Sequence, residues 1–193
     1  MVVGAGFVRM LGYQFTNGHA GETPAHWPRG TTLPLDQERK TLIMFAHPRC
    51  PCTRASLEEL NRLMARRSQS VAVHVKFLRP PRVVDGWTKT DLRQGVAAIP
   101  GINVSEDLDG SEAARFGAET SGFVVLYDPQ GRLLFKGGIT GSRGHVGDNE
   151  GQGAVSALLA GESSVPRRTR VFGCSLLDKC DGSPAYPTPS FQQ

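Results

Sequence analysis

A short apolar run that ends in two closely spaced cysteines most constrains how this chain can fold. Residues 41–46 read TLIMFA, and the segment HPRCPC follows at once. A continuous apolar run of this length is typical of a buried strand. Residues 53–67 then repeat leucine and methionine at three- and four-residue steps, the spacing of an amphipathic helix. The sequence therefore predicts a buried strand that runs into Cys50 and Cys52 just before a helix.

The elements that follow continue an alternation of strands and helices. Further strands are expected at 71–78, 102–104, 123–127 and 132–136, and further helices at 87–98, 111–116 and 154–160. The DPQG segment at 128–131 is a turn signal, because proline presets one dihedral angle and glycine accepts the left-handed position. This order of elements predicts an α/β domain with a central mixed sheet.

A length of 193 residues fits one domain with extensions. We expect an N-terminal extension at 1–40, the domain at 41–161, and at 162–193 a tail that carries Cys174 and Cys180. Residues 2–15 are apolar but interrupted by Arg9. They are either the remnant of a membrane anchor or signal segment that starts upstream, with residues 16–40 as linker, or an ordinary terminus.

Several function classes are disfavoured by composition and motif. The net charge of +4, from 22 basic and 18 acidic residues, is a poor indication of nucleic-acid binding. No stretch approaches the length of apolar sequence that crosses a bilayer. The glycine-rich loop GITGSRGHVGDN, at 138–149, lacks the Gly-Lys-Ser/Thr ending of a phosphate-binding loop, which argues against nucleotide binding.

The position of the cysteines suits thiol chemistry. The thiolate, and not the thiol, attacks a disulfide, and a helix N-terminus lowers the pKa of a cysteine through unpaired N–H groups and the helix dipole. Cys50 and Cys52 satisfy that placement, and Arg49 and Arg54 add positive charge nearby. His47 adds more when protonated; its alternative role is a strand-end histidine that caps backbone groups.

The segments MFAHPRCPC and FVVLYDPQGRLLFKGG resemble the two halves of the thioredoxin core, over about residues 41–175. The chain is most similar to the small bacterial RedB-like family, whose members show HPRCPCTR, a Gly- and His-containing loop after the hairpin, and a VFGC tail. The resemblance implies a thioredoxin-like fold: β-α-β, an insert, then a β-hairpin and a helix. It also implies thiol–disulfide exchange, with Cys174 of the VFGC segment as a resolving thiol or third ligand.

Two departures from the thioredoxin pattern qualify this expectation. Pro51 alone separates the cysteines, so a Cys50–Cys52 disulfide is expected to be strained and to favour donating or isomerising disulfides. Where the family has a cis-proline that shapes the substrate groove and blocks metal binding, this chain has Thr120, Ser121 and Gly122. That difference weakens a reductase function and favours a metal site.

The expected topology gathers these groups at one edge of the sheet. The segment 120–122 and the loop 138–149, with Arg143 and His145, are predicted to line the site. The leading interpretation is exchange on protein thiols or disulfides without a cofactor. The more exposed and more anionic of Cys50 and Cys52 attacks, and the other cysteine or Cys174 resolves the mixed disulfide. The interpretation requires sulfurs that solvent can reach.

Two alternatives remain open at this stage. One is binding or transfer of Cu(I) or another soft metal by Cys50, Cys52 and His145. The other is a non-catalytic adaptor that keeps the fold for protein binding. The expected location is periplasmic or at the cell envelope, with a membrane tether through an upstream anchor; the alternative is cytoplasmic.

Overall fold

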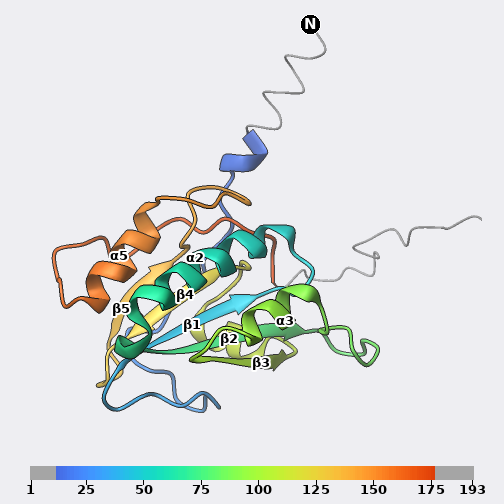
Figure 1. Ribbon diagram of the computed structural model, residues 1–193. Helices are drawn as coiled ribbons and strands as arrows, with labels where there is room; N and C mark the ends of the chain where they lie inside the picture. The colour runs from blue at the N-terminus through green and yellow to red at the C-terminus, as the bar shows by residue number, and fades with distance from the viewer. Residues whose placement is uncertain (1–11, 177–193) are drawn as a thin grey trace, which may run out of the picture.

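A five-stranded mixed sheet with helices packed against it forms the centre of the molecule (Figure 1). The structure is a computed structural model and describes residues 12–176. The strands are β1 (Lys40–Ala46), β2 (Val71–Arg79), β3 (Ile102–Leu108), β4 (Phe123–Tyr127) and β5 (Leu133–Gly137). They lie in the order β3-β2-β1-β4-β5, with β1, β2 and β3 parallel and β4 antiparallel to both β1 and β5.

The helices agree with the predicted elements and differ at their ends. They are α2 (Pro51–Arg67), which runs into the short 3-10 turn η1 (Ser68–Ser70), then α3 (Asp91–Ala97), α4 (Ser111–Phe116) and α5 (Glu150–Leu159). α3 begins four residues later than expected, because the Thr90 side chain caps it by accepting the Arg93 N–H. α5 begins four residues earlier, because Asn149 caps it by accepting the Gln152 N–H.

Alternation along β1 builds a core on each face of the sheet. Leu42 and Met44 join a cluster with the apolar faces of α2, α3 and α5. Ile43 and Phe45 join a second cluster, to which α4 contributes. Successive side chains on a strand point to opposite faces, so the apolar run of β1 lies in both cores. The strand that leads to the cysteines is thereby held on both sides.

The connection β1-α2-β2, followed by the hairpin β4-β5 and α5, is a thioredoxin-like topology, with α3, β3 and α4 in the insert. This confirms the predicted fold class. Within residues 12–176, none of the helices has the length and apolar content needed to cross a membrane. Cys180 and most of the apolar stretch at 2–15 lie outside the described residues.

Two segments at the ends of the described chain pack on the face opposite α2, and the first of them begins with a short helical stretch at 12–15. The N-terminal segment packs there through Trp27, whose ring meets the rings of Phe116 and Tyr127 edge-on at 5.3 Å each. Residues 167–176, here called the C-terminal strap, run beside the end of β5 and then beside residues 119–121. Figure 1 shows the strap in orange and red, crossing from α5 toward the end of β1. The strap carries Cys174 back to the start of α2.

Candidate thiol site

The junction of β1 and α2 places Cys50 at the N-cap of the helix. Its backbone is extended, with φ −85° and ψ 118°, and Pro51 occupies the first helical turn, where a missing N–H costs nothing. Cys52 lies inside the first turn, because the helix begins two residues earlier than predicted. Only Cys50 therefore precedes the helix; the expectation that both cysteines do so is wrong for Cys52.

Ser121 ties the end of β1 to the start of α2. Its hydroxyl oxygen accepts the His47 N–H at 2.8 Å and lies 2.6 Å from the Thr53 hydroxyl. The N–H of Gly122 also donates to the Phe45 carbonyl at 2.8 Å. Residues 120–122 thus lie at the site, as their position before β4 predicts, and Ser121 is fully buried there.

The C-terminal strap pairs with this same segment as a short antiparallel strand. The Ser121 N–H donates to the Cys174 carbonyl and the Leu176 N–H donates to the Glu119 carbonyl, each at 2.8 Å. The approach is close at Gly173, where a Cβ would lie 2.0 Å from the Ser121 carbonyl oxygen. Only glycine lets the two backbones approach so closely, so the glycine before Cys174 fixes the position of that cysteine.

This pairing of the strap brings the sulfur of Cys174 to that of Cys50, 124 residues away in the sequence. The Sγ atoms of Cys50 and Cys174 are 2.9 Å apart, and both cysteines are free. A disulfide needs about 2.05 Å between its sulfurs, so a small movement would join them. The partner of Cys50 in this structure is therefore Cys174.

The two sulfurs of this pair have opposite electrostatic environments. Hydrogen bonding from Cys174 holds the pKa of Cys50 well below its ordinary value, against the effect of burial, and hydrogen bonding from Thr53 acts in the same direction. The interaction with the Cys50 sulfur raises the pKa of Cys174, and burial adds to this. The reduced pair therefore shares one proton at neutral pH, with Cys50 as thiolate and Cys174 as thiol.

Cys52 stays a thiol beside this pair. Burial raises its pKa, as does the nearby Cys50 charge, and the Arg143 guanidinium partly offsets both. Arg143 is anchored by the N-terminal segment: its backbone N–H and its side chain donate to the carbonyls of Gln14 and Thr16. The loop 138–149 thus supplies Arg143 to the site, as predicted.

Other predicted cations face away from the sulfurs. The Arg49 guanidinium stacks on the Trp87 ring, 5.0 Å from its centroid, and Arg54 forms an exposed ion pair with Asp91 at 2.5 Å. Neither contributes to the lowered pKa of Cys50, which corrects the expectation that they do. The His47 ring accepts the Arg49 N–H through Nδ1, which is the backbone-capping role weighed as its alternative.

The structure does not gather the predicted soft-metal ligands. His145 is exposed, and its backbone N–H donates to the Ser142 carbonyl within the loop. Across residues 12–176, no three or more His, Cys, Asp and Glu side chains are arranged to hold a metal ion. Cys50, Cys52 and His145 therefore do not form the donor set that the copper alternative requires.

The sulfurs differ sharply in their exposure to solvent. Cys50 is 0% exposed and Cys52 is 7% exposed, which corrects the expectation that solvent reaches one of them. Cys174 is half-buried and is the most accessible of the three. A hollow of about 740 Å³ lies nearby, lined by residues 16–19, Glu119, Thr120, Arg143 and both chain neighbours of Cys174, but by none of these three cysteines.

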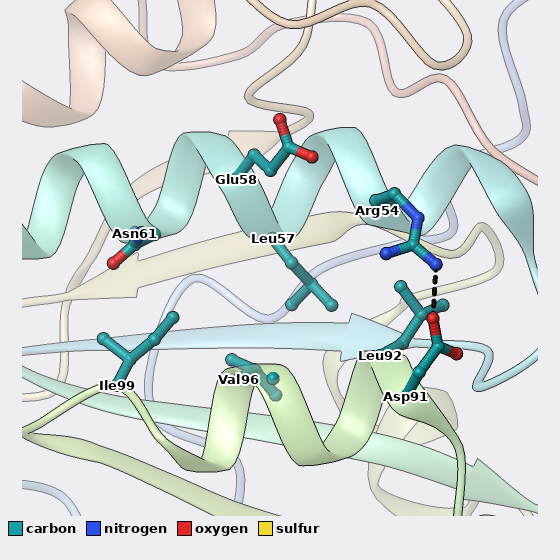
Figure 2. Close-up of a pocket in the computed structure, with 9 residues that line it drawn as sticks. Arg54, Leu57, Glu58, Asn61, Asp91, Leu92, Val96 and Ile99 are labelled. Carbon is teal, nitrogen blue, oxygen red and sulfur yellow. Dashed lines mark hydrogen bonds and ion pairs between the residues drawn. The ribbon is translucent and has the colours of Figure 1, made fainter.

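A second hollow lies away from the sulfurs, between α2 and α3. It has a volume of about 190 Å³, and Leu57, Leu92 and Val96 give it apolar walls. Figure 2 shows these side chains directed between the two helices, with the Arg54–Asp91 ion pair spanning one end. None of the three cysteines at the site lines it.

Two residues that the sequence did not single out for the site take part in it. Thr53 stabilises the Cys50 thiolate and contacts Ser121. The sequence position of Thr53 could have indicated this role, because the third residue after an N-cap presents its N–H to the side chain of the N-cap residue. Trp87 binds Arg49 and meets the His47 ring edge-on, and no local pattern in the sequence indicates this contact.

Comparisons with known proteins add to the fold and not to the site. No protein-family model and no curated protein matches this chain. An uncharacterized conserved protein from Geobacillus kaustophilus superposes with a TM-score of 0.62 at 18% identity, over 86% of this chain and 94% of that one. A hypothetical protein from Sinorhizobium meliloti 1021 does so with a TM-score of 0.58 at 21% identity, over 84% and 94%. The chain thus has a thioredoxin-like fold of a form that also occurs in these two bacterial proteins.

Proposed function

We propose that this protein is a thiol–disulfide oxidoreductase whose working pair is Cys50 and Cys174. The observation that carries the proposal is the 2.9 Å separation of their sulfurs across the β1–α2 junction and the strap. A thiol and a thiolate at this distance are the reduced form of an exchanging pair. Cys52, which the sequence suggested as the partner of Cys50, stands beside the pair.

The environment of Cys50 favours disulfide donation. A stabilised thiolate stabilises the reduced form and is a good leaving group, and both make the corresponding disulfide more oxidising. We therefore expect a reduction potential above about −200 mV. Two electrons pass from a partner dithiol to the Cys50–Cys174 disulfide, and a protein disulfide of higher potential restores the oxidised form.

The substrates are protein thiols or disulfides, and the working place is an oxidising compartment outside the cytoplasm, where a disulfide of this kind persists. Membrane tethering and the RedB-like relationship remain predictions from the sequence. The metal and adaptor alternatives are not favoured by any specific contact in the described residues.

Disulfide mapping tests the proposal. Trypsin separates the cysteines onto peptides 50–54, 171–179 and 180–193. After oxidation with diamide, mass spectrometry should find peptide 50–54 linked to peptide 171–179. The link should persist in Cys52→Ser and disappear in Cys50→Ser and in Cys174→Ser. A bond within peptide 50–54, or between 171–179 and 180–193, would contradict the proposal.

A further inference from the structure

The buried thiolate raises the question of which sulfur meets the partner. Cys50 is 0% exposed, with the helix below it and the strap against it. A protein disulfide or thiol cannot reach it while the strap is in place. Cys174 is half-buried and lies on the outer of the two elements. Access alone therefore distinguishes the two sulfurs.

We propose that Cys174, and not a cysteine of the helix motif, is the sulfur that partner thiols attack. The inference rests on the proposed function, since it requires the Cys50–Cys174 disulfide. Cys50 is 0% exposed and Cys52 is 7% exposed, whereas Cys174 is half-buried. Of these three cysteines, Cys174 is thus the most exposed to a partner thiol.

The exchange then proceeds in two balanced steps. A partner thiolate attacks the Cys174 Sγ, a mixed disulfide forms between partner and Cys174, and the Cys174–Cys50 bond breaks with its electron pair leaving on the Cys50 sulfur. A second partner thiolate attacks the partner's own sulfur in the mixed disulfide, which forms the partner disulfide and expels the Cys174 thiolate. That thiolate takes a proton from solvent, and the partner has lost the two electrons that the protein gained.

The backbone of the strap supports this assignment. The Cys174 carbonyl accepts the Ser121 N–H, and the Leu176 N–H, two residues later, donates to the Glu119 carbonyl. These hydrogen bonds fix the main chain of the strap while the Cys174 side chain meets Cys50. The leaving sulfur sits at a helix N-cap, where Thr53 stabilises the negative charge that develops on it. Attack at Cys174 thus places the charge on the sulfur best able to hold it, whereas attack at Cys50 would expel the less stabilised thiolate.

A monothiol probe tests which sulfur is attacked. The Cys52→Ser protein, oxidised to the Cys50–Cys174 disulfide, is treated briefly with reduced glutathione, quenched in acid, alkylated and digested. Glutathione is expected on peptide 171–179 and the alkyl group on peptide 50–54, with at least a tenfold excess over the reverse pattern. Glutathione mainly on peptide 50–54 would overturn the inference and leave the proposed function standing. Failure to form the starting disulfide would refute both.

Discussion

The two cysteines that meet at the site are held by very different parts of the molecule. Cys50 caps a helix whose Leu60 and Leu63 lie in the main core, and the strand before it is buried on both faces. Cys174 lies on an irregular strap held by a few backbone hydrogen bonds and by apolar side chains at its edges. Regions with few core contacts open at a lower free energy than the core does. We therefore expect the helix side to be rigid and the strap to open locally.

The largest expected effect tests that difference directly. Leu60 is fully buried in the main core, so Leu60→Ala should lower the free energy of unfolding by about 2–5 kcal/mol. Phe172 is buried on the strap but belongs to neither core cluster, so Phe172→Ala should cost about 1–2 kcal/mol. Urea unfolding followed by circular dichroism measures both. Equal losses would mean that the strap unfolds only with the core.

A substitution at Gly173 tests whether close packing of the strap positions Cys174. In Gly173→Ala the new Cβ meets the Ser121 carbonyl, so the strap must lift away and formation of the Cys50–Cys174 disulfide should slow about tenfold, since overpacking costs about 1–3 kcal/mol. The quantity to measure is the rate of disulfide formation in a glutathione redox buffer.

The matched control is Gly153→Ala, in α5, where no atom lies within 4 Å of the added Cβ. It should leave disulfide formation unchanged and raise the free energy of unfolding by about 0.5–1 kcal/mol, because alanine favours the helix. Slowing of disulfide formation by both substitutions alike would show that close packing at Gly173 does not position Cys174.

The same contrast explains what could be predicted from the sequence. Regular elements follow from local patterns: the apolar run of β1 and the leucine spacing of α2 place Cys50 at a helix start without knowledge of any distant residue. The sheet order and the proximity of residues 120–122 follow once those elements are arranged as a thioredoxin-like fold.

The pairing of Cys174 does not follow from local patterns. The strap has no periodicity, and its position depends on backbone contacts with Lys136 and Glu119, far away in the sequence. The resemblance of the VFGC segment pointed to Cys174, whereas spacing alone favoured Cys52 as the partner. Arg49 and Arg54 illustrate the same limit, since sequence proximity put them beside the sulfurs while Trp87 and Asp91 hold them elsewhere.

A pH titration tests whether the strap supplies the stabilisation of the Cys50 thiolate. Hydrogen bonding from Cys174 is the largest cause of the lowered pKa of Cys50, so Cys174→Ala should raise that pKa and reduce thiolate absorbance near 240 nm at pH 7. Cys174→Ser should retain part of the effect, because the serine hydroxyl can still donate. An unchanged titration in Cys174→Ala would show that the helix N-terminus alone is sufficient.

The pH dependence of the stability of the reduced protein should reflect the ionisation of Cys50. The pKa of Cys50 is lower in the folded protein than in the unfolded chain. The contribution of Cys50 to the free energy of unfolding is therefore fully present above the ordinary thiol pKa of about 8.5, and it is lost as the pH falls through the lowered pKa of the folded state. Between those limits the folded pair binds fewer protons than the unfolded chain, so stability rises with pH. Cys174→Ala should flatten this rise in unfolding experiments at a series of pH values.

The smallest expected effect is that of Arg143 on the Cys52 thiol. Arg143 lies on the loop before α5, is held by the N-terminal segment, and lowers the pKa of Cys52 against the effect of burial. Arg143→Gln should therefore raise the pKa of Cys52 further and slow its alkylation by iodoacetamide, because the guanidinium no longer favours the Cys52 thiolate. The exposed Arg54→Gln is the control, since Arg54 pairs with Asp91 and should leave every thiol unchanged. If Arg143→Gln instead slows the alkylation of Cys50 more than that of Cys52, the loop 138–149, and not the strap, determines the charge of the buried Cys50 sulfur. The comparison between a rigid helix side and an opening strap would then have to include this loop.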